Sequence, residues 1–188
     1  MREFIFSNPR GNALDMDNLS ALEKVLETEN APLLLTGAGN KFSTGLNRNQ
    51  LSEELTRLFD EVVDKLFHYE NVTIAFVNGD CTGGALSILS ACDLRFSVPD
   101  ARFSTPSVFL NRPYPPRAFR VILLTIGLSH TQSLIYLGQE LSAQQAQEIG
   151  LIHAIVASKE EMHQYIARIQ RGFPAIRQMK LASRSLLL

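Results

Sequence analysis

The sequence has few features that would tie the protein to a metal ion, a nucleic acid or a membrane. Its only two cysteines, Cys81 and Cys92, lack the spacing of metal ligands and lie in a strongly apolar stretch, so we expect reduced core thiols. The formal net charge of -1 gives no general attraction to nucleic acid or to an anionic membrane surface. No apolar run approaches the length of a membrane span, and the start of the chain does not resemble a signal peptide. We therefore expect a cytoplasmic protein with no metal site.

Tandem repeats, linkers and low-complexity tracts are also absent from the sequence. Hydrophobic residues make up 45% of the 188 residues and charged residues 20%, which is an ordinary mixture for a globular domain of this size. We therefore expect one domain over residues 1–188. Strands and short helices are expected over about residues 1–117, and mainly helices over about residues 118–188.

The stretch from residue 72 to residue 93 combines a short strand, a pair of glycines and a buried helix. Residues 73–77 form a β-rich apolar run, and residues 85–92 are small and apolar throughout, as in a helix buried on all sides. Between them, Gly83 and Gly84 allow close approach to a ligand and leave the first backbone N–H groups of the helix free. Such donors suit an anion or a developing oxyanion. The alternative is a tight turn with no ligand.

The periodicity of apolar residues and the capping signals predict the remaining elements. Further strands are expected at residues 4–6, 33–36, 94–98 and 102–104. Further helices are expected after a cap at Asp17, over residues 51–69, 118–126 and 129–137, after capping boxes at Ser142 and Ser158, and from Pro174 onward. The proline- and arginine-rich residues 105–117 cannot form a helix interior or a central strand, so we expect an irregular loop. It is either functional or a rigid surface connection.

Several short motifs follow one another along nearly the whole chain in the order typical of one family. They are Asn12-Ala13-Leu14, residues 35–39 (LTGAG), residues 42–46 (FSTGL), Val77-Asn78-Gly79, Gly83-Gly84, Cys92-Asp93, residues 141–143 (LSA) and residues 149–151 (IGL). In these motifs the chain resembles the crotonase (enoyl-CoA hydratase/isomerase) superfamily. The resemblance implies an α/β fold in which repeated ββα units form the core and helices form the C-terminal half.

The crotonase resemblance also implies a substrate and a means of stabilising charge. The family binds acyl-CoA thioesters and holds the thioester oxygen between two backbone N–H groups. By position these belong to Leu46 and Gly84, with Gly45 and Gly83 in the turns that present them and contact the substrate. Two fixed donors stabilise the negative charge that develops on an enolate oxygen. The acyl group would be carried by coenzyme A or by an acyl-carrier protein, and no cofactor other than coenzyme A within the substrate is expected.

Two positions depart from the family's hydratases, which place a pair of glutamates where this chain has Ser87 and Ser107. A serine hydroxyl has no useful acidity near neutral pH and cannot replace a carboxylate as a proton carrier. We therefore expect a short family member that is not a standard hydratase. Ser87 and Ser107 would lie in the catalytic site or act as small fillers. Asp80 and Asn47 are expected beside the same pocket, Asp80 as a conceivable displaced base.

The loop that follows residue 104 resembles that of methylmalonyl-CoA decarboxylase-like members of the family. In those proteins a tyrosine in the loop holds the carboxylate of the substrate. The resemblance implies that Tyr114, with Arg112 or Asn111, orients such a carboxylate, the alternative being a packed loop aromatic. Decarboxylation needs no strong base, because the carboxylate leaves and the oxyanion donors take up the charge.

Two functions therefore remain open from the sequence. The first is a lyase or isomerase that forms an enolate from an acyl thioester, with decarboxylation as the chemically easiest reaction. The second is a catalytically inactive homologue that binds acyl-CoA or a partner chain. Because members of the family assemble as trimers or pairs of trimers, we also expect a homotrimer or hexamer.

Overall fold

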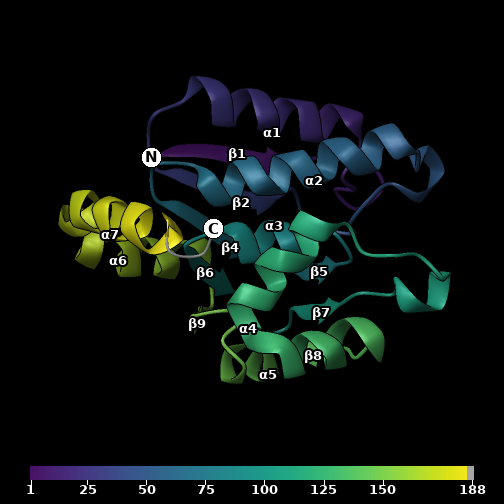
Figure 1. The fold of residues 1–188 in the computed structure, drawn as a ribbon. Coiled ribbons are helices and arrows are strands. Elements are labelled where there is room, and N and C mark those ends of the chain that lie inside the picture. The colour runs from purple at the N-terminus through teal and green to yellow at the C-terminus, as the bar shows by residue number, and fades with distance from the viewer. Residues whose placement is uncertain (186–188) are drawn as a thin grey trace.

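A five-stranded parallel sheet lies at the centre of the computed structural model, which describes residues 1–185 (Figure 1). The last three positions of the predicted domain lie outside the described residues. The sheet has the strand order β1-β2-β4-β6-β9. Its strands are β1 (Arg2–Phe6), β2 (Leu33–Gly37), β4 (Thr73–Val77), β6 (Leu94–Ser97) and β9 (Ala154–Ile155). A second sheet has the order β3-β5-β7-β8, and only its last pair is antiparallel. Its strands are β3 (Lys41–Ser43), β5 (Asp80–Thr82), β7 (Arg102–Ser104) and β8 (Leu141–Ser142).

Three ββα units connect the two sheets. In each unit the first strand belongs to the large sheet, the second strand to the small sheet, and a helix follows. The units are β2-β3-α2, β4-β5-α3 and β6-β7-α4, with the helices α2 (Glu53–His68), α3 (Ala85–Ala91) and α4 (Pro116–Tyr136). The remaining helices are α1 (Met16–Thr28), α5 (Ala143–Glu148), α6 (Lys159–Ile169) and α7 (Phe173–Ser185), with short 3₁₀ turns at Arg48–Gln50, Val108–Leu110 and Gln170–Gly172. The predicted α/β class with repeated ββα units and a helical C-terminal half is confirmed.

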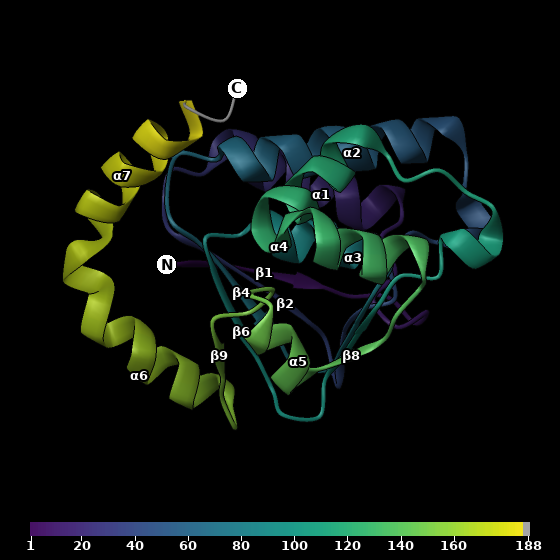
Figure 2. The ribbon, with the colours of Figure 1, turned by 60° about the horizontal axis from the view of Figure 1, so that its bottom comes forward.

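Alternation along the strands decides which helices cover each face of the large sheet. Leu35 and Val77 belong to the main core, together with apolar residues of α1, α2, α3 and α4. The neighbouring side chains Leu34 and Phe76 point to the opposite face, where Met162 of α6 packs against them. Figure 2 accordingly shows α6 and α7 on the side of the sheet away from the other helices.

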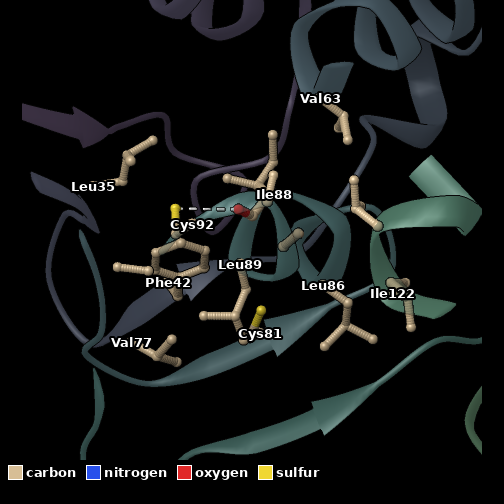
Figure 3. Packing of buried hydrophobic residues seen from close by; sticks show 14 of the residues in the cluster. Leu35, Phe42, Val63, Val77, Cys81, Leu86, Ile88, Leu89, Cys92 and Ile122 are labelled. Carbon is tan, nitrogen blue, oxygen red and sulfur yellow. Dashed lines mark hydrogen bonds between the residues drawn. The ribbon is translucent and has the colours of Figure 1, made fainter. Parts of the chain in front are cut away.

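The helix α3 is buried at every position, as its composition predicts. Its Leu86 and Leu89 lie among side chains from the strands and from α4 (Figure 3). Both cysteines are free and buried beside it, so the prediction of core thiols is confirmed. Burial raises the pKa of the Cys92 thiol to about 12. These contacts fix the beginning of α3, and therefore Gly83 and Gly84, against the core.

The longest helix is interrupted in the middle. Gly127 has φ 75° and ψ 169°, so α4 consists of two helical segments that meet there, as the predicted helix end at this glycine requires. By length and composition α4 is the one helix in the described part of the chain that could cross a membrane. Its residues Val121, Ile122 and Leu134 instead pack in the core.

Two helix starts differ from their sequence expectation by a few residues. The cap of α1 is Asp15, whose side chain accepts a hydrogen bond from Asn18 N, so the prediction of Asp17 as the cap is wrong. Asp17 lies within the first turn, where a carboxylate also favours the helix dipole. The helix predicted from residue 51 begins at Glu53, because the side chain of Ser52 accepts from Leu55 N. The capping box at Ser142 and Gln145 is confirmed.

His153 makes the stability of the fold depend on pH. Its Nδ1 accepts a hydrogen bond from Arg95 N at 3.1 Å. Partial burial of the imidazole ring, and then the positive charge of Arg95, lower the pKa of His153 from 6.5 to about 4. The unfolded chain therefore binds a proton in this window that the folded chain does not, and the free energy of unfolding should fall as the pH drops from about 6.5 to about 4.

The measurement is urea unfolding above and below that window. We expect His153→Gln to show a smaller loss of stability on acidification than the unsubstituted protein. His163→Gln, on the exposed face of α6, is the control and should lose as much stability as the unsubstituted protein. An unaltered pH dependence in His153→Gln would contradict this account.

Candidate functional site

Two glycine-containing turns that are far apart in sequence meet at one point of the structure. A Cβ atom on Gly45 would lie 2.5 Å from Thr82 O and 3.0 Å from Gly84 N, which no real side chain tolerates. Gly45 and Gly83 also have positive φ values of 80° and 60°. Glycine is therefore required at position 45 by close contact and by backbone conformation, and at position 83 by backbone conformation. Their meeting places Leu46 and Gly84 on the wall of one pocket.

The N–H groups of Leu46 and Gly84 are both available to a ligand. Leu14 pairs with the residues on either side of Leu46, through Leu14 N to Gly45 O at 2.8 Å and Asn47 N to Leu14 O at 3.0 Å. The N–H of Leu46 consequently faces away from Leu14. Within the described residues, neither this N–H nor that of Gly84 donates a hydrogen bond. Gly84 is also the cap of α3, so the helix dipole adds positive potential at its N–H.

The pocket has a volume of about 220 Å³, and no acidic residue lines it among the described residues. Its lining residues are Thr44, Leu46, Arg48, Leu51, Thr56, Phe59, Gly83, Gly84, Thr105, Pro106, Ser107, Leu110, Arg112, Pro113, Tyr114 and Pro115. None of these residues is an aspartate, a glutamate or a histidine. The charged side chains among them are Arg48 and Arg112, which are both exposed at the mouth. The pocket therefore combines two backbone donors with positive charge.

Tyr114 lines the pocket, but its hydroxyl is bound to protein groups. The hydroxyl donates to Gly83 O at 3.0 Å and lies 3.1 Å from Ser87 Oγ. Ser87 is completely buried, does not line the pocket, and donates to Ala118 O at 2.9 Å. The predicted site residue Ser87 thus reaches the pocket only through Tyr114. Burial raises the pKa of Tyr114 well above its ordinary value, so this hydroxyl remains protonated and cannot act as a base.

Ser107, which is expected from the family resemblance to stand in place of the second glutamate, lines the pocket. Its Oγ lies 2.8 Å from the Oγ1 of Thr105, another lining residue that is 1% exposed. The carbonyl of Ser107 accepts from Leu110 N and Arg112 N, both at 3.1 Å. These bonds hold the loop that carries Arg112 close to the pocket. The loop expected over residues 105–117 therefore forms one wall of the site.

Asn47 and Asp80 do not line the pocket, contrary to their expected position beside it. The Asn47 side chain accepts from Asn49 N at 3.1 Å, because it caps the 3₁₀ turn that follows. Asp80 forms an ion pair with Lys41 at 3.1 Å at the start of β5, where both side chains are 42% exposed. A displaced base at Asp80 is therefore not supported by its position.

Sequence reasoning missed three lining residues with clear roles. Arg48 supplies charge at the mouth, Thr105 contacts Ser107, and the ring of Phe59 stands behind Gly84, 2.9 Å from where a Cβ would lie. Only Phe59 had a signal in the sequence, since it lies on the apolar face of the predicted second helix. An adjoining groove is lined by two acidic residues, Glu53 and Asp60. The Oδ1 of Asp60 accepts from Ala118 N at 2.9 Å and so holds the start of α4, whereas Glu53 is exposed in the first turn of α2.

Comparison with known proteins agrees with this geometry. The profile of the enoyl-CoA hydratase/isomerase family matches residues 3–185. The chain is 31% identical over 165 residues to a short-chain-enoyl-CoA hydratase of Clostridium acetobutylicum, covering 81% of this chain and 63% of that protein. It is 32% identical to a hydroxycinnamoyl-CoA hydratase-lyase of Pseudomonas fluorescens, covering 79% of this chain and 59% of that protein. The chain thus spans less than two thirds of the length of these relatives.

Solved structures show the same fold. The crystal structure of an enoyl-CoA hydratase from Bacillus anthracis superposes with a TM-score of 0.87 at 23% identity, covering 99% of this chain and 80% of that one. A structure of Pseudomonas aeruginosa DspI superposes with a TM-score of 0.86 at 26% identity, covering 97% of this chain and 82% of that one. With its paired glycine turns, its ββα units and a profile match over nearly its whole length, the chain belongs to the enoyl-CoA hydratase/isomerase family, the crotonase superfamily.

Proposed function

We propose that this protein binds an acyl-CoA thioester and stabilises its enolate between the N–H groups of Leu46 and Gly84. The support is the meeting of two glycine turns that leave these two donors free on one pocket wall. Donors fixed before the reaction stabilise charge without reorganising as the charge develops. The names of the curated relatives, which are hydratases, isomerases and a hydratase-lyase of CoA esters, favour the same substrate class.

The reaction that suits this pocket best is decarboxylation of a malonyl-type thioester. The observation that carries this choice is the lining, which has serine at the expected glutamate position and no aspartate, glutamate or histidine. Hydration and isomerisation both need a group that moves protons. In decarboxylation the bond between Cα and the carboxylate carbon breaks, carbon dioxide leaves, and the electron pair passes into the enolate oxygen. Solvent water then supplies the proton that Cα takes up, leaving hydroxide.

Arg112 is the group that we assign to the carboxylate of such a substrate. It lines the pocket and is exposed, and no ion-pair partner is found for it among the described residues. The Tyr114 hydroxyl, which the family resemblance would assign to this role, already donates to Gly83 O. A guanidinium is suited to a carboxylate because it offers paired donors in one plane.

Arg112→Ala should raise the KM for malonyl-CoA by about tenfold, with a smaller change in kcat. This is the loss expected for one charge-assisted hydrogen bond, because the bond is made in both the ground state and the transition state. Binding of acetyl-CoA, which has no such carboxylate, should change less. The control is Arg168→Ala, on the exposed side of α6. Steady-state kinetics and a binding titration give these values. Equal weakening of both ligands would contradict a carboxylate-specific role.

A second candidate function is binding of an acyl-CoA or acyl-carrier thioester without turnover. The same absence of acidic and imidazole side chains from the lining supports it. The test that separates the two functions is incubation of the purified protein with malonyl-, methylmalonyl- and crotonyl-CoA, with products identified by mass spectrometry. Loss of carbon dioxide from either of the first two supports the decarboxylase, binding without products supports the second function, and hydration of crotonyl-CoA contradicts both.

We also propose that the protein assembles as a homotrimer or hexamer, as the family resemblance implies. Large apolar side chains are exposed near the loop wall and on α4, including Phe109 at 73%, Leu137 at 73% and Leu128 at 57%. The ring of Phe109 lies against Gly138, the residue after Leu137, and neighbouring exposed apolar groups favour contact with another chain. Light scattering tests this proposal, and a monomeric mass at micromolar concentration would contradict it.

A further inference from the structure

A tyrosine donates a hydrogen bond to the carbonyl oxygen of the peptide group between Gly83 and Gly84. In a trans peptide the carbonyl oxygen and the N–H point in opposite directions. The Gly84 N–H is the free donor at the pocket, so Gly83 O points back along α3. There it accepts from Leu86 N at 3.0 Å and from the Tyr114 hydroxyl at 3.0 Å. A carbonyl oxygen can only accept, so Tyr114 is the donor in this contact.

This peptide group needs support because it joins two glycines. Neither residue has a Cβ, so rotation of the peptide plane between them costs little. Rotation would turn the Gly84 N–H away from the position of the substrate oxygen. Misplacing a catalytic group by about 1 Å can cost about 100-fold in rate. Hydrogen bonds on Gly83 O oppose this rotation directly.

Ser87 fixes the position of the tyrosine hydroxyl. Its Oγ lies 3.1 Å from Tyr114 Oη and donates to Ala118 O at 2.9 Å. Ser87 belongs to α3 and Ala118 to the first turn of α4, and both residues are 0% exposed. Each hydroxyl carries one proton and the two carbonyl oxygens can only accept, so when Tyr114 donates to Gly83 O and Ser87 donates to Ala118 O, no proton remains for the contact between the two hydroxyls. This contact therefore positions the tyrosine oxygen by packing, between two helices and the glycine turn.

We propose that Tyr114 is a positioning residue, whose donation to Gly83 O holds the Gly84 N–H in the direction that an oxyanion requires, with Ser87 setting the place of the hydroxyl. This inference rests on the proposed function in taking Gly84 as a donor to the thioester oxygen. It differs from the role implied by family resemblance, in which Tyr114 would bind a carboxylate of the substrate. Its support is the set of three contacts that join Tyr114, Ser87 and the glycine turn.

The kinetic test is Tyr114→Phe, which keeps the ring and removes the donor. We expect kcat for decarboxylation to fall about 10- to 100-fold with KM nearly unchanged, a smaller loss than the 10²–10³ for removing an oxyanion donor outright. Ser87→Ala should change kcat in the same direction by less, because Tyr114 still reaches Gly83 O. Tyr165→Phe, on the exposed face of α6, is the control and should match the unsubstituted protein.

A ligand-free measurement judges the positioning independently of any activity. Labelling the 11 glycines with ¹⁵N gives a simple amide spectrum, in which the signal missing from Gly84→Ala identifies Gly84. We expect this signal to be sharp in the unsubstituted protein and in Tyr165→Phe. In Tyr114→Phe we expect it to shift and broaden, because the peptide group then moves between orientations.

An unchanged Gly84 signal in Tyr114→Phe would overturn the proposal whatever the kinetics show. So would a kcat equal to that of the unsubstituted protein, or a loss confined to KM, which would indicate direct contact with the substrate. If no thioester is turned over but the Gly84 signal changes as expected, the proposed decarboxylation fails and the positioning by Tyr114 stands. The two failures are therefore distinguishable.

Discussion

Gly84→Pro is expected to lower kcat for a malonyl-type thioester by about 10²–10³-fold, the usual cost of removing one oxyanion donor. Proline lacks the N–H, and its fixed φ near −65° suits Gly84, which has φ −58° at the start of α3. No internal hydrogen bond is lost, because the Gly84 N–H donates to no other group in the described residues. The substitution therefore removes the donor without removing an internal hydrogen bond.

The matched control is Gly84→Ala. Both substitutions add a Cβ that would lie 2.9 Å from Phe59 Cζ, so both variants share the cost of moving that ring. Alanine keeps the N–H, and the ratio of the two kcat values isolates the contribution of the donor. Circular dichroism checks that both variants fold. Equal kcat values for the proline and alanine variants would contradict the assignment of Gly84 as an oxyanion donor.

Asp93→Asn is expected to destabilise the fold by about 3–5 kcal/mol, the cost of breaking a buried ion pair by removing one partner. Asp93 binds Lys180 and Arg184 of α7, each at 2.7 Å, and its side chain is 12% exposed. The same carboxylate accepts from the N and Oγ1 of Thr73, both at 2.8 Å. It therefore joins α7 to the start of β4, and the asparagine variant leaves two cations without their anion.

The electrostatics of Lys180 support this prediction. Burial lowers the pKa of Lys180 to about 8, and the charge of Asp93 opposes that shift. Without the carboxylate, the pKa of Lys180 should fall further and part of the cost should be relieved by loss of its proton. Asp80→Asn is the control, because its ion pair with Lys41 is exposed and should be worth at most about 1 kcal/mol. Urea unfolding compares the two variants, and equal effects would contradict the structural role of Asp93.

The regular elements with strong local signals could be predicted from sequence. The strand over residues 73–77 and the helix that begins at Ala85 could be predicted because their composition alone indicates burial, and the structure confirms both elements. The break at Gly127 is confirmed because the glycine adopts a positive φ there. The strand β9 lies within a short extended link that the sequence predicts over residues 152–156. The strand β8 was not predicted, since it has two residues and forms only by pairing with β7. No local pattern encodes such a pairing.

The parts of the candidate site that depend on unusual backbone conformation could be predicted from the sequence. The parts that depend on the path of the loop that carries Tyr114 could not. Gly45 and Gly83 indicated special backbone, but only the fold shows that their turns touch. Asn47 is adjacent in sequence to pocket residues and Asp80 lies a few residues before Gly83, yet local capping and an ion pair direct their side chains to other partners. The contact between Tyr114 and Gly83 O spans 31 residues and requires the loop to fold back over α3.

The measurement that tests the central claim most directly is deuterium uptake with methylmalonyl-CoA in D₂O. The sample also contains preformed propionyl-CoA labelled with ¹³C, and mass spectrometry follows both thioesters. Decarboxylation through an enolate, without a base in the pocket, predicts that newly formed propionyl-CoA gains one deuterium at Cα while the ¹³C-labelled propionyl-CoA gains none. Deuterium in the preformed thioester would reveal a base that abstracts the Cα proton and would contradict the proposed function. Unchanged methylmalonyl-CoA would contradict it as well if malonyl-CoA is also left unchanged under the same conditions.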